Sequence, residues 1–246
     1  MIGILALALV SGVLIGCIGI GGVLLVPVLS LAGTDVHAAI GASMASYLLG
    51  GVIGTALFTR GASIDWRSAS WLGLGAMPGA FAGALLTARL GGSVLLALVG
   101  LAVSFSGLRT LLRRDRGEAP YRKLPAPMLG ATGALVGLGS ALTGTGGPVL
   151  LVPLLMWLEL PVLTAVGLSQ AIQIPIAALA SLGNLWEGQL DLRLAVLLSI
   201  GVAGGSLVGA QVAHALPRLF MTRLVACVLL LVGALLVFRA GHALAL

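Results

Sequence analysis

Long apolar runs separated by short polar stretches make up most of this 246-residue chain. A helix of about 20 apolar residues is long enough to cross the hydrocarbon core of a bilayer, so the runs predict membrane helices. We therefore expect an all-α integral membrane protein with about eight apolar segments. The runs cover about residues 2–33, 38–58, 69–88, 92–112, 128–158, 162–185, 193–214 and 219–239.

Two of these runs contain a glycine break. The first is GIGGVLLVP, Gly19 to Pro27, and the second is GTGGPVLLVP, Gly144 to Pro153. At 1.5 Å per residue each run is too long for one straight crossing of a core about 30 Å thick. Irregular backbone at membrane depth persists only where protein covers it or where it lines a cavity. Each break is therefore a candidate site, and each broken run either crosses the membrane or is re-entrant.

The two halves of the chain are related by an offset of about 126 residues. Equivalent positions carry the same residue types in the same order, which indicates an internal duplication. The matched residues are Gly41 and Ser43 with Gly167 and Ser169, Asp65 and Arg67 with Asp191 and Arg193, and Gly79 and Gly83 with Gly205 and Gly209. We expect two homologous four-segment repeats, 1–112 and 128–246, joined by a basic cytoplasmic linker, 113–127. The aspartates Asp65 and Asp191 are expected to anchor helix starts.

Charge adds an orientation to this layout. Only 8% of the residues are charged and 59% are hydrophobic, far from the composition of a soluble domain. Six of the thirteen basic residues lie between Arg109 and Lys123, which places this loop in the cytoplasm by the positive-inside rule and removes the case for nucleic-acid binding. The rule does not choose between crossing and re-entrant runs. Leu246 is cytoplasmic in the first case and external in the second.

Little else in the sequence suggests metal or cofactor chemistry. Cys17 and Cys227 lie in apolar runs and are expected to be small buried hydrophobes rather than a disulfide or metal pair. The histidines, His37 among them, have no ligand spacing. Asn184 is expected to be a helix cap or an interface residue. We expect no metal and no cofactor.

Three motifs together resemble the TauE/SafE family of sulfite and organosulfonate exporters. They are the GxGG run with a following proline in each half, the A-x-G-x-S segment at Ala39 to Ser43 and again at Ala165 to Ser169, and the turns IDWR and LDLR that end at Arg67 and Arg193. The resemblance covers nearly the whole chain outside the linker. It implies movement of small sulfur-containing anions across the bacterial cytoplasmic membrane. Thr145 stands where the family usually has an apolar residue, and Pro148 extends the second motif.

A helix N-terminus offers unpaired N–H groups and about half a positive charge, so two facing breaks would bind one anion. Discontinuous helices at equivalent places in two repeats are the best sequence pointer to a transport site. The expected substrate-binding residues are Gly19, Gly21, Gly22, Ser43, Tyr47, Gly144, Thr145, Gly146, Gly147, Ser169, Gln170 and Gln173. The alternatives stay open that the glycines serve only tight helix packing and that the polar side chains serve helix-to-helix hydrogen bonds.

No acidic residue lies deep in an apolar run, which disfavours a carboxylate proton relay. An anion leaving a negative-inside cell is assisted by about 2.3 kcal/mol per charge per 100 mV. We therefore expect a secondary transporter that exports small sulfur anions, with a passive anion channel as the alternative. An intramembrane enzyme built on Ser43 and a structural subunit are remoter alternatives. The expected partners are the small anion and the lipid bilayer, with a homo-oligomer left open.

Overall fold

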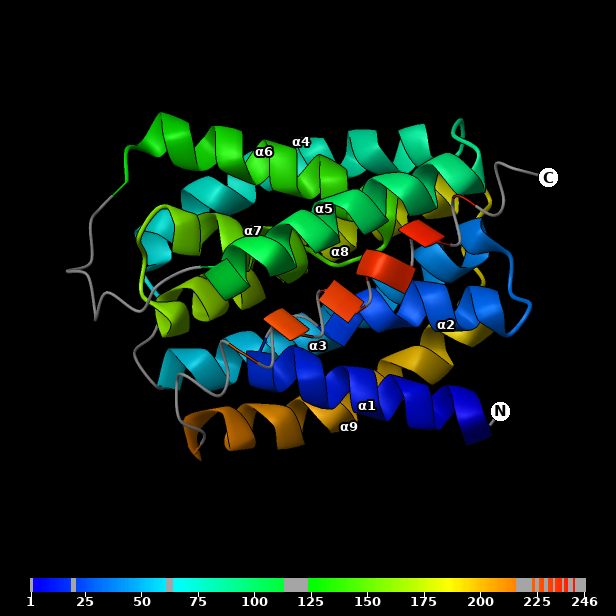
Figure 1. Cartoon of the computed structure of the whole chain (residues 1–246), viewed down its shortest axis with the longest axis horizontal. Coiled ribbons are helices and arrows are strands. Elements are labelled where there is room, and N and C mark those ends of the chain that lie inside the picture. The colour runs from blue at the N-terminus through cyan, green and yellow to red at the C-terminus, as the bar shows by residue number, and fades with distance from the viewer. Residues whose placement is uncertain are drawn as a thin grey trace.

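The computed structural model describes residues 2–18, 21–60, 64–112 and 124–215, together with scattered positions between 223 and 241. Every regular element in these ranges is helical (Figure 1). The elements are α1 (Ile2–Ile18), η1 (Gly21–Leu24), α2 (Leu25–Leu31), α3 (Val36–Arg60), α4 (Trp66–Thr87), α5 (Gly92–Leu112), α6 (Ala126–Thr143), α7 (Pro148–Trp157), α8 (Val162–Trp186) and α9 (Leu192–Ala215). Most of the run expected at 219–239, and residues 113–123 of the expected linker, lie outside the described residues.

Five helices in the described ranges are long and apolar enough to cross a membrane. They are α3, α4, α6, most of α8, and α9 as far as Gly209, whereas α1 and α7 are shorter apolar helices. Large apolar side chains such as Leu74, Leu135 and Val196 are exposed on the outer surface, which suits contact with lipid rather than water. The all-helical, multi-pass membrane fold that the apolar runs predicted is confirmed.

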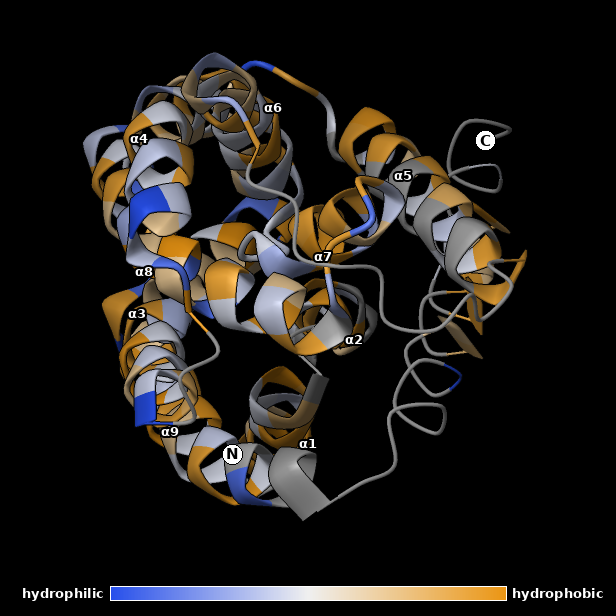
Figure 2. Cartoon of the chain, turned by 90° about the vertical axis from the view of Figure 1, so that its left-hand side faces the viewer, coloured by the Kyte–Doolittle hydropathy of each residue, from blue (hydrophilic) through white to orange (hydrophobic). Residues whose placement is uncertain are grey.

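The helices from the two parts of the chain interleave. The closest pairs are α1 with α9 and α4 with α6, and α3 lies against α8 between these pairs. Helix α3 also contacts α9, while α8 also contacts α4. Viewed along the helices, the short α2 and α7 lie in the middle of this arrangement (Figure 2). The first helix of each part therefore packs against a long helix of the other part, α1 against α9 and α6 against α4.

Glycines explain the closeness of these pairs. A side chain on Gly205 or Gly209 of α9 would collide with the backbone of α1, at the carbonyl oxygens of Leu9 and Val13. On α4, Gly79 faces the backbone of α6 in the same way. Small residues let membrane helices approach until their backbones touch, and this contact replaces the hydrophobic driving force that lipid does not provide.

The direction of α1 follows from its contacts with α9. Gly201 of α9 lies against Leu5 and Ala8, and Gly209 lies against Val13, so the two helices run parallel. Helix α9 begins directly after Gly188 to Asp191. These residues line a pocket together with Asp35, in the turn after α2, and His37, in the first turn of α3. We call this end of the molecule the pocket face. The start of α1 therefore lies at the pocket face, as does the turn that follows α2. The first broken segment thus returns to the face from which it starts.

The second broken segment returns to the opposite face. Helices α3 and α8 are antiparallel, because Gly41 lies against Asn184 and Gly54 against Gln170. Helix α3 therefore ends, at Arg60, on the face where α8 begins, and we call this end the Arg60 face. Helix α4 starts there and runs parallel to α6, since Gly75 meets Gly130 and Gly83 meets Leu138. The α6–α7 segment thus begins and ends at the Arg60 face.

Two local predictions have different outcomes. The carboxylates of Asp65 and Asp191 accept hydrogen bonds from backbone N–H groups in the first turns of α4 and α9, which confirms their expected role at helix starts. Cys17 is buried and free, as predicted, but the prediction that Cys227 is buried is wrong. Cys227 is exposed, and a small apolar side chain has little cost of exposure where the surrounding solvent is lipid.

Candidate functional site

The two glycine breaks meet in the interior. A side chain on Gly22 would come within 2.9 Å of the carbonyl oxygen of Thr145. Gly144 ends α6 in the left-handed conformation with φ of 63°, and Gly146 and Gly147 follow with φ of 79° and 101°. Only glycine adopts such backbone readily, so the sequence GTGG is required for the chain to reverse here. Gly21 begins η1, while Gly19 lies outside the described residues.

Tyr47 of α3 joins the two breaks. Its hydroxyl donates a hydrogen bond to the carbonyl oxygen of Gly22 at 2.7 Å and lies 3.2 Å from the carbonyl oxygen of Gly144. The ring also fills the space beside Gly146, where an added Cβ would come within 2.6 Å of the ring carbon Cδ2. Tyr47 is completely buried. The sequence placed Tyr47 among the site residues but gave no indication that both breaks would share its hydroxyl.

Thr145 lies at the centre of the second break and is buried. Its hydroxyl is 2.9 Å from the hydroxyl of Thr143, and its backbone N–H donates to the carbonyl oxygen of Ser140. The Thr143 hydroxyl donates to the carbonyl oxygen of Gly139 at 2.7 Å, so Thr145 donates to Thr143 and keeps only acceptor positions at the break. Helix α7 starts just beyond, and Pro148 at its first position lacks an N–H group and suits the first helical turn.

Gln170 and Gln173 occupy one face of α8 and connect it to the first part of the chain. The Gln170 amide Nε2 donates to the carbonyl oxygen of Ile15 at 2.6 Å, just before the first break, and the Gln173 Nε2 donates to the carbonyl oxygen of Tyr47 at 3.1 Å. Both side chains are fully buried. Neither Oε1 atom has a hydrogen-bond partner among the described residues. Helix-to-helix bonding thus accounts for the amide N–H groups but leaves two buried acceptors unexplained.

The two expected serines are buried at equivalent positions of α3 and α8. Ser169 donates to the carbonyl oxygen of Val166 within its own helix, at 2.7 Å. Ser43 lies one turn before Tyr47, and its carbonyl oxygen accepts a hydrogen bond from Ser46. The structure therefore brings the described glycines, Tyr47, Thr145 and the two glutamines into one connected region, whereas the Ser169 hydroxyl bonds within α8.

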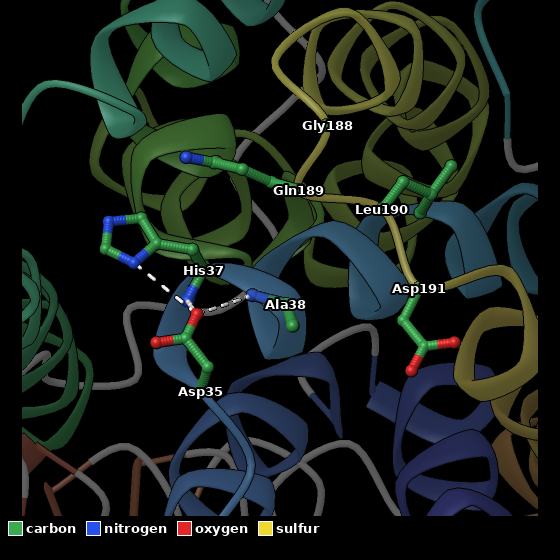
Figure 3. A pocket seen from close by; sticks show the side chains of 7 residues that line it. All are labelled: Asp35, His37, Ala38, Gly188, Gln189, Leu190 and Asp191. Carbon is green, nitrogen blue, oxygen red and sulfur yellow. Dashed lines mark hydrogen bonds and ion pairs between the residues drawn. The ribbon is translucent and has the colours of Figure 1, made fainter.

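A pocket of about 400 Å³ lies at the pocket face rather than at the breaks (Figure 3). Its lining residues are Asp35, His37, Ala38, Gly188, Gln189, Leu190 and Asp191. The carboxylate of Asp35 caps α3 by accepting from the N–H groups of His37 and Ala38. The sequence did not predict this pocket, because its two walls are separated by about 150 residues in the chain.

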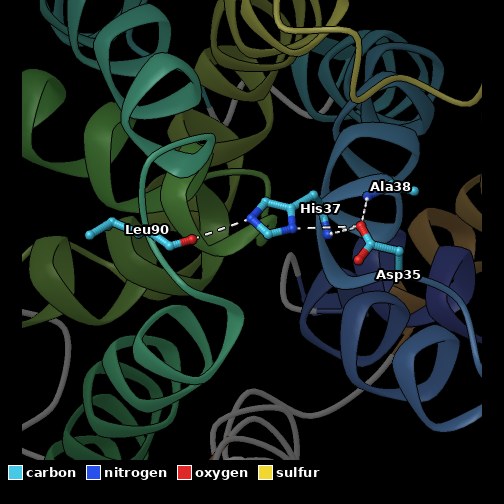
Figure 4. A network of polar contacts seen from close by, with 4 residues as sticks. All are labelled: Asp35, His37, Ala38 and Leu90. Atoms are coloured by element: carbon cyan, nitrogen blue, oxygen red, sulfur yellow. Dashed lines mark hydrogen bonds and ion pairs between the residues drawn. The ribbon is translucent and has the colours of Figure 1, made fainter.

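His37 connects two turns at the pocket face (Figure 4). Its Nε2 lies 3.3 Å from the carbonyl oxygen of Leu90, in the turn between α4 and α5, and its Nδ1 lies 3.6 Å from the Asp35 carboxylate. These contacts link the start of α3 to the turn between α4 and α5. Within the described ranges, no group of three or more His, Cys, Asp or Glu side chains is placed to hold a metal ion.

Comparison with known proteins places these features in a family. The family model described as "Sulfite exporter TauE/SafE" matches residues 4–236. The chain is 27% identical over 241 residues to the "Probable membrane transporter protein YdhB" of Bacillus subtilis (strain 168), covering 92% of this chain and 96% of that protein. It is 28% identical over 207 residues to a "Probable membrane transporter protein" of Xylella fastidiosa (strain 9a5c), covering 80% and 78%. No solved structure matches the chain.

Proposed function

We propose that this chain exports small oxyanions of sulfur, such as sulfite or sulfonates, across the bacterial cytoplasmic membrane. The chain belongs to the sulfite exporter TauE/SafE family and is a membrane transporter rather than an enzyme. The observation that carries this proposal is the meeting of two glycine breaks around the Tyr47 hydroxyl at the centre of the helical bundle. Interrupted helices that face each other in a bundle are a recurrent form of transport site.

We propose further that the chain forms two inverted repeats. In support, α1 and α2 return to the pocket face while α6 and α7 return to the Arg60 face. The contacts of Gly79 and Gly83 with α6 also recur, at the offset of the duplication, as those of Gly205 and Gly209 with α1. The basic residues Arg60 and Arg67 favour a cytoplasmic Arg60 face, which makes the pocket face external.

The residues around the breaks suit a small oxyanion. Helix α7 starts at Pro148, directly after Gly146 and Gly147, and the positive end of its dipole lies at the break. The Thr145 hydroxyl adds acceptor positions for an O–H group of a protonated anion or of water, because its own O–H donates to Thr143. The unpaired Oε1 atoms of Gln170 and Gln173 can accept an O–H group from a protonated anion or from a water that accompanies it. Such a site binds an anion without burying a cationic side chain.

The energetics support export without a coupled ion. The membrane potential favours the outward movement of an anion by about 2.3 kcal/mol per charge per 100 mV. In the described membrane helices no aspartate or glutamate side chain lies among the buried polar groups. We therefore propose transport down the electrical gradient. A passive channel would be driven by the same electrical gradient. A transporter differs from a channel in that it exchanges a bound substrate from one side for substrate on the other side.

The test measures sulfite efflux from proteoliposomes containing the purified protein. We expect saturable efflux, and counterflow when sulfite is also supplied outside, which a channel does not give. Gly146→Leu should abolish efflux because leucine at a φ of 79° is strained and meets the Tyr47 ring. Gly33→Leu is the control, since Gly33 also has a positive φ, of 91°, but a Cβ added there would meet no described atom within 4 Å. Equal efflux by the two correctly inserted variants would reject the site, and absence of sulfite efflux from the wild type would reject the substrate.

A further inference from the structure

A line of buried polar atoms runs along one face of α8, from the breaks to the pocket. Neighbouring members are three or eight residues apart, and eight residues are about two helical turns, so they share a helical face. They are Gln170, Gln173, Ser181 and Asn184. Each has a buried oxygen or nitrogen that has no hydrogen-bond partner among the described residues. Gln189, which lines the pocket, continues the line with an unpaired Oε1.

Helix α3 presents glycines to this line. Gly54 faces Gln170, and a side chain there would come within 2.6 Å of the glutamine Oε1. Gly51 lies against Gln173, and Gly41 lies against Asn184 and the carbonyl oxygen of Gln189. The seam between α3 and α8 is therefore closely packed, with polar side chains of α8 lying directly against the glycine backbone of α3. An interface built only for packing has no need of unpaired polar atoms.

Asn184 is the most exceptional member of the line. Its side chain is completely buried, and neither Oδ1 nor Nδ2 has a partner in the described part of the chain. Asn184 was expected to be a helix cap or an interface residue, and its contact with Gly41 of α3 confirms the second alternative. Its backbone carbonyl accepts from the Gln189 N–H at 2.8 Å. Burying an amide without partners costs about 1–3 kcal/mol, so a ligand or water is expected to pair with it.

We propose that the seam between α3 and α8 is the route from the glycine breaks to the pocket, and that Asn184 is a second hydrogen-bonding position for the transported oxyanion. The Nδ2 group donates to an oxygen of the anion, and Oδ1 accepts from a water that moves with it. The identity of this ligand rests on the proposed function, whereas the route rests on the line of buried polar atoms that have no partner among the described residues.

The pocket is suited to release of the transported anion rather than to tight binding of it. The carboxylates of Asp35 and Asp191 repel an anion, although each is partly offset by the first turn of the helix that it caps. The Asn184 amide, one step inside, carries no charge. An anion that reaches the pocket is therefore held less well there than at Asn184, which favours outward release on an external pocket face.

Cysteine labelling tests the route without a transport assay. In a chain with Cys17 and Cys227 replaced by alanine, Asn184→Cys is exposed from the pocket face to the membrane-impermeant anionic reagent 2-sulfonatoethyl methanethiosulfonate. We expect labelling, and slower labelling in the presence of methanesulfonate. Gly188→Cys at the pocket is the positive control, and Leu182→Cys, on the exposed apolar surface of α8, is the negative control. An Asn184→Cys protein that folds and is labelled no faster than Leu182→Cys overturns the route.

Transport by two further variants tests the role of the amide. Asn184→Ala should lower sulfite efflux about tenfold, the equivalent of one hydrogen bond to a charged group. Asn184→Asp keeps the shape but adds negative charge, and should lower efflux further. Equal efflux by wild type and both variants overturns the role of Asn184. Labelling of Asn184→Cys that methanesulfonate slows, in a protein that moves no sulfite, supports the route while rejecting the proposed substrate.

Discussion

Tyr47 donates a hydrogen bond to the carbonyl oxygen of Gly22 at 2.7 Å, and this bond fixes α3 against the first glycine break. The same hydroxyl reaches the carbonyl oxygen of Gly144 in the second break. Carbonyl groups at interrupted helix ends lack partners within the helix, so a shared donor stabilises both interruptions at once. The two breaks are consequently part of one hydrogen-bonded unit.

Replacing Tyr47 by phenylalanine should lower the free energy of unfolding by about 1–3 kcal/mol, because two buried carbonyl groups lose their donor. Thermal unfolding in detergent measures the change. Thr59→Val is the matched control, since the Thr59 hydroxyl donates to the Thr55 carbonyl of its own helix and has no other hydrogen-bond partner in the described part of the chain. If Tyr47→Phe unfolds at the same temperature as Thr59→Val, the bridge does not stabilise the breaks.

The α4–α6 contact gives a second prediction from one pair of facing glycines. Gly75→Ala should destabilise the protein by about 1–3 kcal/mol, because the added methyl group meets the backbone at Gly130. Gly130→Ala should have a much smaller effect, because nothing lies within 4 Å of its added methyl group. The two melting temperatures in the same detergent test the contact. A larger loss for Gly130→Ala would contradict the described packing.

The two faces of the molecule predict which cysteines a membrane-impermeant maleimide reaches in intact cells. With Cys17 and Cys227 replaced, Gly3→Cys at the pocket face should be labelled from outside, whereas Arg67→Cys at the Arg60 face should require permeabilised cells. A Cβ added at Gly3 would meet no described atom within 4 Å, so the substitution is not expected to disturb packing. Protection of Gly3→Cys in intact cells would mean that the first broken segment crosses the membrane.

Gln170 is expected to contribute to transport through both ends of its side-chain amide. Gln170→Leu removes the donor to the Ile15 carbonyl and one of the unpaired acceptors beside the breaks. We expect sulfite efflux to fall at least about tenfold, by loss of a buried hydrogen bond near the anion. Gln211→Leu, the same substitution at an exposed position of α9, should leave efflux unchanged. Similar efflux by both variants would remove Gln170 from the proposed site.

The sequence by itself determined the helices, the places where they break and the caps of α4 and α9. These features are local: apolar runs of sufficient length form helices in lipid, GTGG permits positive φ, and an aspartate reaches N–H groups two or three residues further on.

Only the tertiary structure decided which segments meet. Glycine allows a close approach but does not name the partner, so the pairing of α1 with α9 was not visible in the sequence. The partners of Gln170 and Tyr47 are backbone carbonyl groups, which every residue has and no side-chain pattern marks. For the same reason the sequence left open whether Asn184 caps a helix or lies at an interface between helices. Its burial beneath the pocket depends on helices α3 and α8, which the fold brings together from distant parts of the chain.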